Sequence, residues 1–149
     1  MTNFQIAEKL CEVKFAEFAN YVNSTSTAQI DKIQFTPVQI KYDVYFISAS
    51  TKFVAELKNI NKEYFNYGIE SEKYDYLKYI YNKHNIDPLY ILFLPGGTTK
   101  VVNLNSMFEN EKELKTKYWS CPTATVEDRG IITKKFYICE EKYTTNYAF

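Results

Sequence analysis

Residues 42–59, YDVYFISASTKFVAELKN, carry the strongest structural signal in this chain of 149 amino acids. They predict the end of one strand over 38–48, a Ser/Thr turn, and a second strand over 51–60. Because side chains alternate along a strand, Glu56 and Lys58 share one face, roughly 6–7 Å apart. Asp43 lies on the preceding strand, and an antiparallel turn would bring it alongside Glu56. The stretch therefore predicts two carboxylates and a lysine on one face of a sheet.

The tripeptide Glu-x-Lys is not distinctive by itself, because the sequence contains it at Glu12–Lys14, Glu56–Lys58, Glu113–Lys115 and Glu140–Lys142. The first and third lie on predicted helices, where residues i and i+2 point apart. The last has no acid-bearing pair of strands before it. Only Glu56–Lys58 lies inside a strand that follows an Asp-bearing strand. The alternative for this pair is a solvated ion pair on an exposed strand face, which contributes little to stability.

Two carboxylates with a nearby lysine suit the hydrolysis of a phosphodiester. That reaction needs a divalent cation held by hard oxygen ligands, an activated water, and a positive group near the developing charge. Asp43 and Glu56 would supply the oxygen ligands, and Lys58 would supply the positive group.

The surrounding pattern predicts helices packed against a mixed sheet. A helix over residues 3–23 begins at a capping box made by Thr2 and Gln5, and a second helix runs over 71–84 with Ser71 as its N-cap. The other predicted elements are a strand over 29–36, a hairpin of 89–94 and 100–104 around Pro95-Gly96-Gly97, a helix from Ser106 to about 118, a loop over 119–130, and a strand over 131–139. This order predicts one α/β domain spanning residues 1–149.

The first predicted helix holds a candidate site residue. Placed 100° apart, its apolar residues form an arc that includes Ile6, Leu10 and Phe18. Glu17 projects into this arc, whereas Glu8 and Glu12 fall on the opposite side. A carboxylate directed toward the core is costly unless a cation meets it. The pattern therefore marks Glu17 as a site candidate.

With the motif YDVYF…FVAELKN in this setting, the sequence resembles the PD-(D/E)XK nuclease superfamily, which includes restriction endonucleases and Holliday-junction resolvases. The superfamily core is helix, three strands, helix, strand. Residues 3–94 reproduce this order, which leaves 98–149 as a strand-helix-strand extension. One position departs from the pattern, because Tyr42 stands where a proline would precede Asp43.

The resemblance implies a role for each residue of the motif. Asp43 and Glu56 would hold Mg²⁺ or Mn²⁺, with the Leu57 carbonyl as a further ligand, and Lys58 would orient or deprotonate the attacking water. Many members add a carboxylate from the first helix, which Glu17 matches, with Glu12 as the second choice. The implied activity is that of a nuclease, with DNA as the substrate and RNA as the alternative. Cutting two strands calls for two sites, which a homodimer would supply.

Two further groups each admit two interpretations. Lys73, on the second predicted helix, would either contact a substrate phosphate or belong to a solvated lysine face. Trp119 and Arg129, with the basic pair at 134–135, would form either a stacking and phosphate-binding patch or an ordinary core tryptophan with a structural arginine.

Composition narrows the class of protein. Lys and Arg (18) balance Asp and Glu (18), so binding of a polyanion would depend on a local patch. Three separated cysteines and a single histidine do not make a zinc site. No apolar run suits a signal peptide or a membrane span, so we expect a cytoplasmic protein. The small size and the bias toward Lys, Asn, Ile and Tyr favour a phage or mobile-element source.

Two rivals of the enzyme interpretation come from other classes. One is a catalytically silent nuclease-like module that binds nucleic acid or a protein partner, and the other is a purely structural assembly protein. The intact set of Asp43, Glu56 and Lys58 favours the enzyme, because drift would erode such a set first. Binding of a divalent metal ion separates the enzyme from both rivals.

Overall fold

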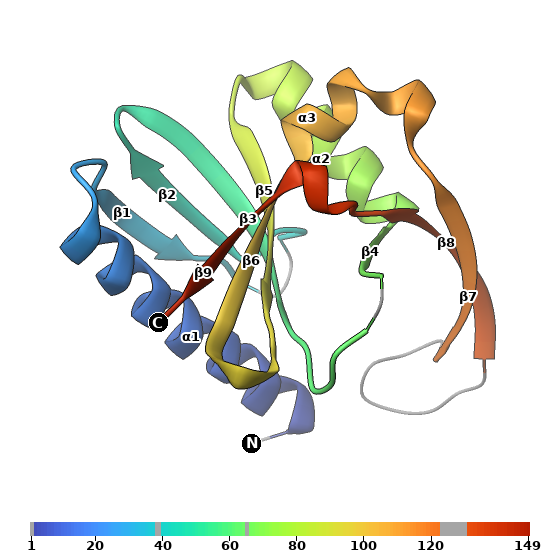
Figure 1. Cartoon of the computed structure of the whole chain (residues 1–149), viewed down its shortest axis with the longest axis horizontal. Coiled ribbons are helices and arrows are strands. Elements are labelled where there is room, and N and C mark those ends of the chain that lie inside the picture. The colour runs from blue at the N-terminus through green and yellow to red at the C-terminus, as the bar shows by residue number, and fades with distance from the viewer. Residues whose placement is uncertain (1, 38–39, 65, 123–130) are drawn as a thin grey trace.

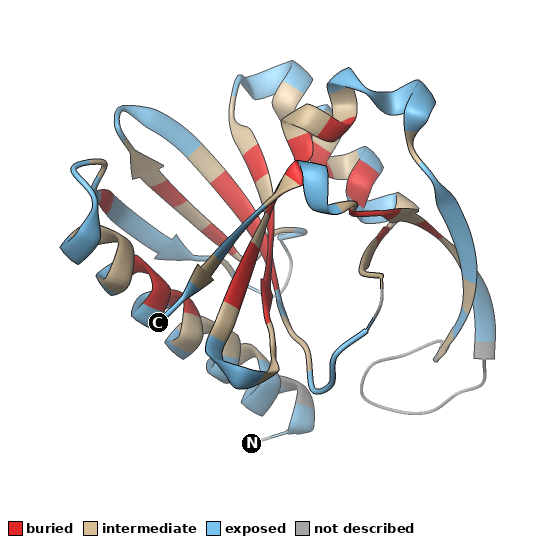
Figure 2. Cartoon of the chain, viewed as in Figure 1, coloured by how far each residue is buried: buried red, intermediate tan, exposed pale blue. Residues whose placement is uncertain are grey.

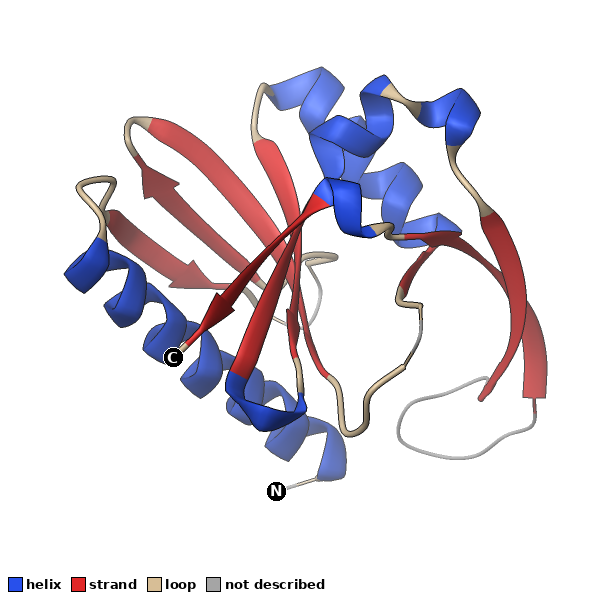
Figure 3. Ribbon diagram, in the orientation of Figure 1, coloured by secondary structure: helices blue, strands red, loops and turns tan. Residues whose placement is uncertain are grey.

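A computed structural model of the protein describes residues 2–37, 40–64, 66–122 and 131–149. The strands form a six-stranded sheet in the order β1-β2-β3-β5-β6-β9 and a three-stranded sheet in the order β4-β8-β7, as Figures 1 and 3 show. In chain order the helices and strands are α1 (Asn3–Thr25), β1 (Ile30–Phe35), β2 (Val44–Ser48), β3 (Thr51–Asn59), β4 (Gly68–Glu70), α2 (Ser71–His84), β5 (Asp87–Phe93), β6 (Thr98–Asn103), α3 (Leu104–Glu109), β7 (Thr116–Pro122), β8 (Ile131–Ile138) and β9 (Thr144–Ala148).

The predicted hairpin of β2 and β3 lies within the large sheet. These two strands pair antiparallel, with Tyr45 opposite Val54. Strand β5 then pairs parallel to β3, with Glu56 opposite Tyr90, and β6 and β9 continue antiparallel. A parallel neighbour needs a long crossover connection, which α2 provides. The prediction of a mixed central sheet flanked by helices is confirmed.

Helix α1 covers one face of this sheet. Phe15 and Phe18 are buried there in a cluster with Ala55 and Leu57 of β3. Lys14 reaches the end of β3, where its Nζ donates a hydrogen bond to the side-chain carbonyl of Asn59. The first half of α1 therefore passes beneath the carboxyl end of β3.

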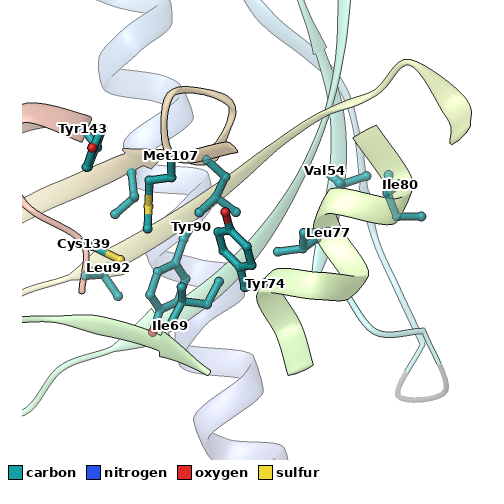
Figure 4. Close-up of a cluster of buried hydrophobic side chains, with 12 residues drawn as sticks. Val54, Ile69, Tyr74, Leu77, Ile80, Tyr90, Leu92, Met107, Cys139 and Tyr143 are labelled. Carbon is teal, nitrogen blue, oxygen red and sulfur yellow. The ribbon is translucent and has the colours of Figure 1, made fainter. Parts of the chain in front are cut away.

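Helix α2 covers the opposite face. Tyr74 and Leu77 are buried in a cluster with Val54 and Tyr90, which Figure 4 shows in close-up. Figure 2 shows buried residues on both the sheet and the helices that cover it. Because residues alternate along β3, Glu56 lies on this α2 face together with Val54.

The predicted orientation of the first helix is wrong. Ile6, Leu10 and Val13 are 52%, 40% and 46% exposed, and Glu17 is exposed as well. Apolar residues occur on two sides of α1, so periodicity alone does not decide which side meets the sheet. The capping box at its start, made by Thr2 and Gln5, is confirmed. In the described residues, no helix is both long enough and apolar enough to cross a membrane.

The C-terminal third differs most from the prediction. Helix α3 begins at Leu104 and is capped by Asn103, whose side chain accepts from the N–H groups of Asn105 (3.1 Å) and Ser106 (3.4 Å). The helix predicted from Ser106 to about 118 therefore exists, but it begins two residues earlier and ends at Glu109. Residues 116–122 form strand β7, so the loop predicted over 119–130 is wrong at 119–122, and residues 123–130 lie outside the described part. Strand β7 pairs with β8, a partner that no local pattern reveals.

Three smaller differences concern the start of β2, the N-cap of α2, and two short strands. Strand β2 begins at Val44, whereas the prediction began at 38; residues 38–39 lie outside the described part. The N-cap of α2 is Glu70, which makes no side-chain capping bond, so the prediction of Ser71 as the cap is wrong. Strands β4 and β9 were not predicted, because each is short and depends on pairing with distant strands.

Candidate active site

Asp43 lies immediately before β2 and is held against β3 by two hydrogen bonds. Its N–H donates to the Ala55 carbonyl at 2.9 Å, which continues the antiparallel ladder by one residue. Its carboxylate Oδ2 accepts from the N–H of Leu57 at 2.7 Å. The Asp43 carboxylate therefore accepts a hydrogen bond from β3 of the kind that a backbone carbonyl would accept if β2 extended further. The hairpin register therefore brings Asp43 beside Glu56.

Glu56 is the most buried acidic residue of the described structure, at 8% exposure. It lies in the middle of the sheet between β2 and β5, and its carboxylate forms an ion pair with Lys73 of α2. Burial, followed by the negative charge of Asp43, raises the pKa of Glu56 to about 7, although Lys73 and Lys58 oppose this shift. The metal-free site therefore holds a carboxyl group that is close to half protonated at neutral pH.

The pKa of Asp43 is also raised, chiefly by burial. The hydrogen bond from the N–H of Leu57 and the charge of Lys73 work in the opposite direction. Ionising both of two neighbouring carboxyl groups, one buried and one half-buried, is unfavourable because their negative charges repel. A bound cation would therefore stabilise the ionised forms of both carboxyl groups.

Lys58 and Lys73 meet the carboxyl pair from two elements. Lys58 lies two residues beyond Glu56 on the same face of β3, is exposed, and lowers the pKa of Glu56. Lys73 is in the first turn of α2, with its side chain 46% exposed. Burial works against its charge, but Glu56, followed by Glu70, raises the pKa of Lys73. Asp43, Glu56 and Lys58 of the motif are thus brought together with Lys73 of the helix predicted over 71–84.

On α1, Glu8 lies close enough to Asp43 for their charges to interact, although the periodicity predicted it on the far side of the helix. Burial and the charge of Asp43 raise the pKa of Glu8, and Glu12 adds to the shift. Burial and Asp43 likewise raise the pKa of Cys11, one turn further on, to about 11. Glu17 is exposed and instead borders a hollow with Asn61 and the turn between β5 and β6. The only sequence feature that marks Glu8 is its helical spacing from Cys11 and Phe15, which lie on the side of α1 that meets the sheet.

The donor set matches the ligands of a hard divalent cation. In the described part of the chain, no three His, Cys, Asp or Glu side chains gather to form a complete metal centre. Mg²⁺ is commonly bound by one or two carboxylates, with waters and substrate phosphates completing its shell. Asp43 and Glu56 supply two such carboxylates. The Leu57 carbonyl lies on the same edge of β3 as the N–H that Asp43 accepts from, because both groups of a strand residue point to one neighbour.

The pKa of Glu56 gives a prediction for metal binding as a function of pH. A metal ligand must be deprotonated, so below pH 7 the ion has to displace a proton from Glu56. We expect Mn²⁺ affinity to rise by up to about ten-fold per pH unit between pH 5.5 and 7 and to level off above. Calorimetric titration in buffers of different ionisation enthalpy would measure both the affinity and the proton release. An affinity that is constant from pH 5.5 to 8 would contradict it.

Comparison with known proteins places the fold. No protein-family model matches the sequence, and no curated protein matches it. Among solved structures, the chain is similar to a Holliday junction resolvase from the archaeal hyperthermophile Archaeoglobus fulgidus. The two share 12% sequence identity with a TM-score of 0.56, over 91% of this chain and 86% of that one. The chain therefore has the restriction-endonuclease-like α/β fold that its sequence predicted.

Proposed function

We propose that the protein is a nuclease that hydrolyses phosphodiester bonds of DNA with Mg²⁺ or Mn²⁺. The observation that carries the proposal is the pair of the half-buried Asp43 and the buried Glu56, whose pKa values are both raised, with Lys58 on the same face of β3 as Glu56. Perturbed carboxyl groups of this kind cluster at functional sites, because burial that is unfavourable for folding is kept where chemistry uses it. The resemblance of the fold to a junction resolvase supports the same class of substrate.

Each residue has a task in this proposal. Asp43 and Glu56 hold the ion, with the Leu57 carbonyl as a further ligand. A bound Mg²⁺ or Mn²⁺ supplies a polarised phosphate and a bound water of lowered pKa. Lys58 orients the attacking water or stabilises the developing negative charge. Lys73 neutralises Glu56 in the metal-free protein and lies close enough to the site to contact a substrate phosphate.

The test of this function is cleavage of defined DNA substrates. Supercoiled plasmid, a four-way junction and single-stranded DNA are incubated with Mg²⁺ or Mn²⁺, and in parallel with EDTA. We expect metal-dependent cleavage of at least one substrate. Absence of cleavage of all three, together with no Mn²⁺ binding by calorimetry, would overturn the enzyme assignment.

The second candidate is a catalytically silent module that binds nucleic acid or a protein partner. One observation favours it: Lys73 already compensates the charge of the buried Glu56 without a metal ion. The calorimetric arm of the test separates the two candidates, because only the enzyme needs the carboxylate pair to exchange Lys73 for a cation. The phage source, the cytoplasmic location and the homodimer stay predictions from the sequence.

The α1 carboxylate gives a paired prediction. We propose that Glu8, and not Glu17, assists the site, because the charge of Asp43 raises the pKa of Glu8, whereas Glu17 is exposed and borders the hollow with Asn61. Glu8→Gln is expected to lower metal-dependent cleavage by about ten-fold, the scale typical of groups that support a metal site from the side. Glu17→Gln is the matched control on the same helix and should cleave as the parent protein does. Equal losses in both variants, or a loss only in Glu17→Gln, would contradict the assignment.

A further inference from the structure

A cleft of about 770 Å³ is lined by residues of both the large and the small sheet. Its lining residues come from the carboxyl end of β3, from the segments 60–64 and 66–67, and from strands β4, β5, β7 and β8, whose arrangement Figure 1 shows. Lys58 borders it, and Glu56 lies two residues before Lys58 on the same strand face. Lys58 therefore belongs to both the cleft and the proposed catalytic site.

Aromatic rings form much of the cleft wall, and Trp119 is the most firmly placed of them. A Cβ atom added to Gly68 would lie 2.8 Å from Trp119 Cζ3, so the indole rests directly on the backbone of β4. Trp119 also packs against Phe136, with ring centroids 4.7 Å apart and tilted by 49°. Trp119 is nevertheless only half-buried, and Tyr64 across the cleft is 51% exposed. Large aromatic surface is therefore held rigidly but left accessible.

The charge of the cleft suits an anionic chain. Lys58 and Lys117 border it, both are exposed, and no carboxylate is among the described residues that line it. The amide side chains of Asn59, Asn61 and Asn66 line the same space and offer both donors and acceptors. In a protein with no net charge, this is a local positive and aromatic surface of the kind a polyanion requires.

We propose that this cleft binds an unpaired nucleotide of the DNA substrate, with its base stacked on Trp119 and its phosphates near Lys58 and Lys117. The inference rests on the proposed nuclease function and deepens it by naming the substrate class. A base inside a duplex is covered on both faces by its neighbours, so only an unpaired base can present a face to an indole. The volume lies in the range of sites that enclose one small molecule, about 300–1,000 Å³. The substrate is therefore DNA with a single-stranded segment next to the scissile phosphate.

Trp119 is the single tryptophan of the chain, so its fluorescence reports directly on the cleft. The wild-type protein is titrated in EDTA with a single-stranded oligonucleotide and, separately, with the same sequence as a blunt duplex. We expect saturable quenching by the single strand, at a concentration at least about ten-fold lower than any quenching by the duplex. No quenching by the single strand, or equal quenching by the blunt duplex, overturns the proposal.

Two variants on strand β7 locate the effect. Tyr118 precedes Trp119, is 67% exposed and is absent from the cleft wall, so Tyr118→Ala is the matched control. By anisotropy of a labelled single strand, Trp119→Ala should bind about ten-fold more weakly, and Tyr118→Ala within two-fold of the parent. Equal affinity in the two variants would overturn the stacking role of Trp119.

These binding measurements need no metal ion, so a negative result for the cleft can be distinguished from a negative result for the nuclease function. Cleavage without quenching would refute the cleft and leave the nuclease standing. Quenching without cleavage or metal binding would keep the single-strand site and refute the nuclease. Arg129, which the sequence grouped with Trp119, lies outside the described residues and has no part in this inference.

Discussion

Replacing Glu56 by Gln is expected to lower metal-dependent DNA cleavage by about 10³-fold or more, while making the metal-free protein more stable at pH 8. The loss follows because an amide is a weaker ligand for Mg²⁺ than a carboxylate, and an ion at such a site contributes several kcal/mol to the transition state. Cleavage rates at saturating metal, with calorimetric Mn²⁺ binding, would measure it. Asp43→Asn should lose activity to a similar extent.

The stability change in Glu56→Gln has the opposite sign to the activity change. The folded-state pKa of about 7 lies above the ordinary value of 4.5, so folding takes up a proton between these two pH values. The free energy of unfolding of the parent protein therefore falls as pH rises from about 4.5 to 7, by up to about 3 kcal/mol in total. Glutamine does not titrate, so the variant should lack this fall. Urea unfolding at pH 5 and pH 8, with EDTA present, measures both slopes.

The control for Glu56→Gln is Glu72→Gln, an exposed acid in the first turn of α2 beside Lys73. It should change neither cleavage nor the dependence of stability on pH. If Glu56→Gln still cleaves at the parent rate, Glu56 has no part in the catalytic site. A variant that loses cleavage together with stability at every pH would show a structural role for Glu56 in place of a catalytic one.

Replacing Lys58 by Ala should reduce the cleavage rate by about 10²–10³-fold and leave Mn²⁺ affinity within a few-fold of the parent value. Lys58 is exposed, so its loss leaves no cavity and no unpaired buried group. Its positive charge would act on the attacking water or on charge that develops at the phosphate, which makes the effect one on rate and not on metal binding. Single-turnover cleavage at saturating protein and metal separates the two.

Lys52→Ala is the matched control, because Lys52 is also exposed and lies on the same face of β3, nearer its start. It should cleave as the parent does. If Lys58→Ala cleaves within three-fold of the parent and Lys73→Ala does not, the catalytic lysine is the one that α2 provides. Loss in both Lys52→Ala and Lys58→Ala would indicate a general requirement for positive charge on this strand.

Local sequence patterns predicted some elements of the fold and not others. Strand β3, helix α2 and the β5–β6 hairpin were predicted close to their observed bounds, because each is defined by local periodicity or by turn residues within a few positions. Strand β2 was predicted to end where it does, but it begins at Val44 and not at 38. The face of α1 was not, since Ile6, Leu10 and Val13 make its outer side as apolar as its inner side. The periodicity consequently directed Glu17, which is exposed, toward the sheet, and Glu8, which is half-buried, to the opposite side.

Sequence alone predicted the grouping of Asp43, Glu56 and Lys58 on one face of the sheet. Asp43, Glu56 and Lys58 share a face because two adjacent strands alternate in phase, a property of the backbone that requires no distant contact. Tertiary structure decided the rest: Lys73 meets Glu56 only after α2 crosses the sheet, and Trp119 borders a cleft only because β7 pairs with β8 and rests on Gly68. These contacts join residues far apart in the chain. Their formation depends on packing between elements, which the periodicity of any single segment does not encode.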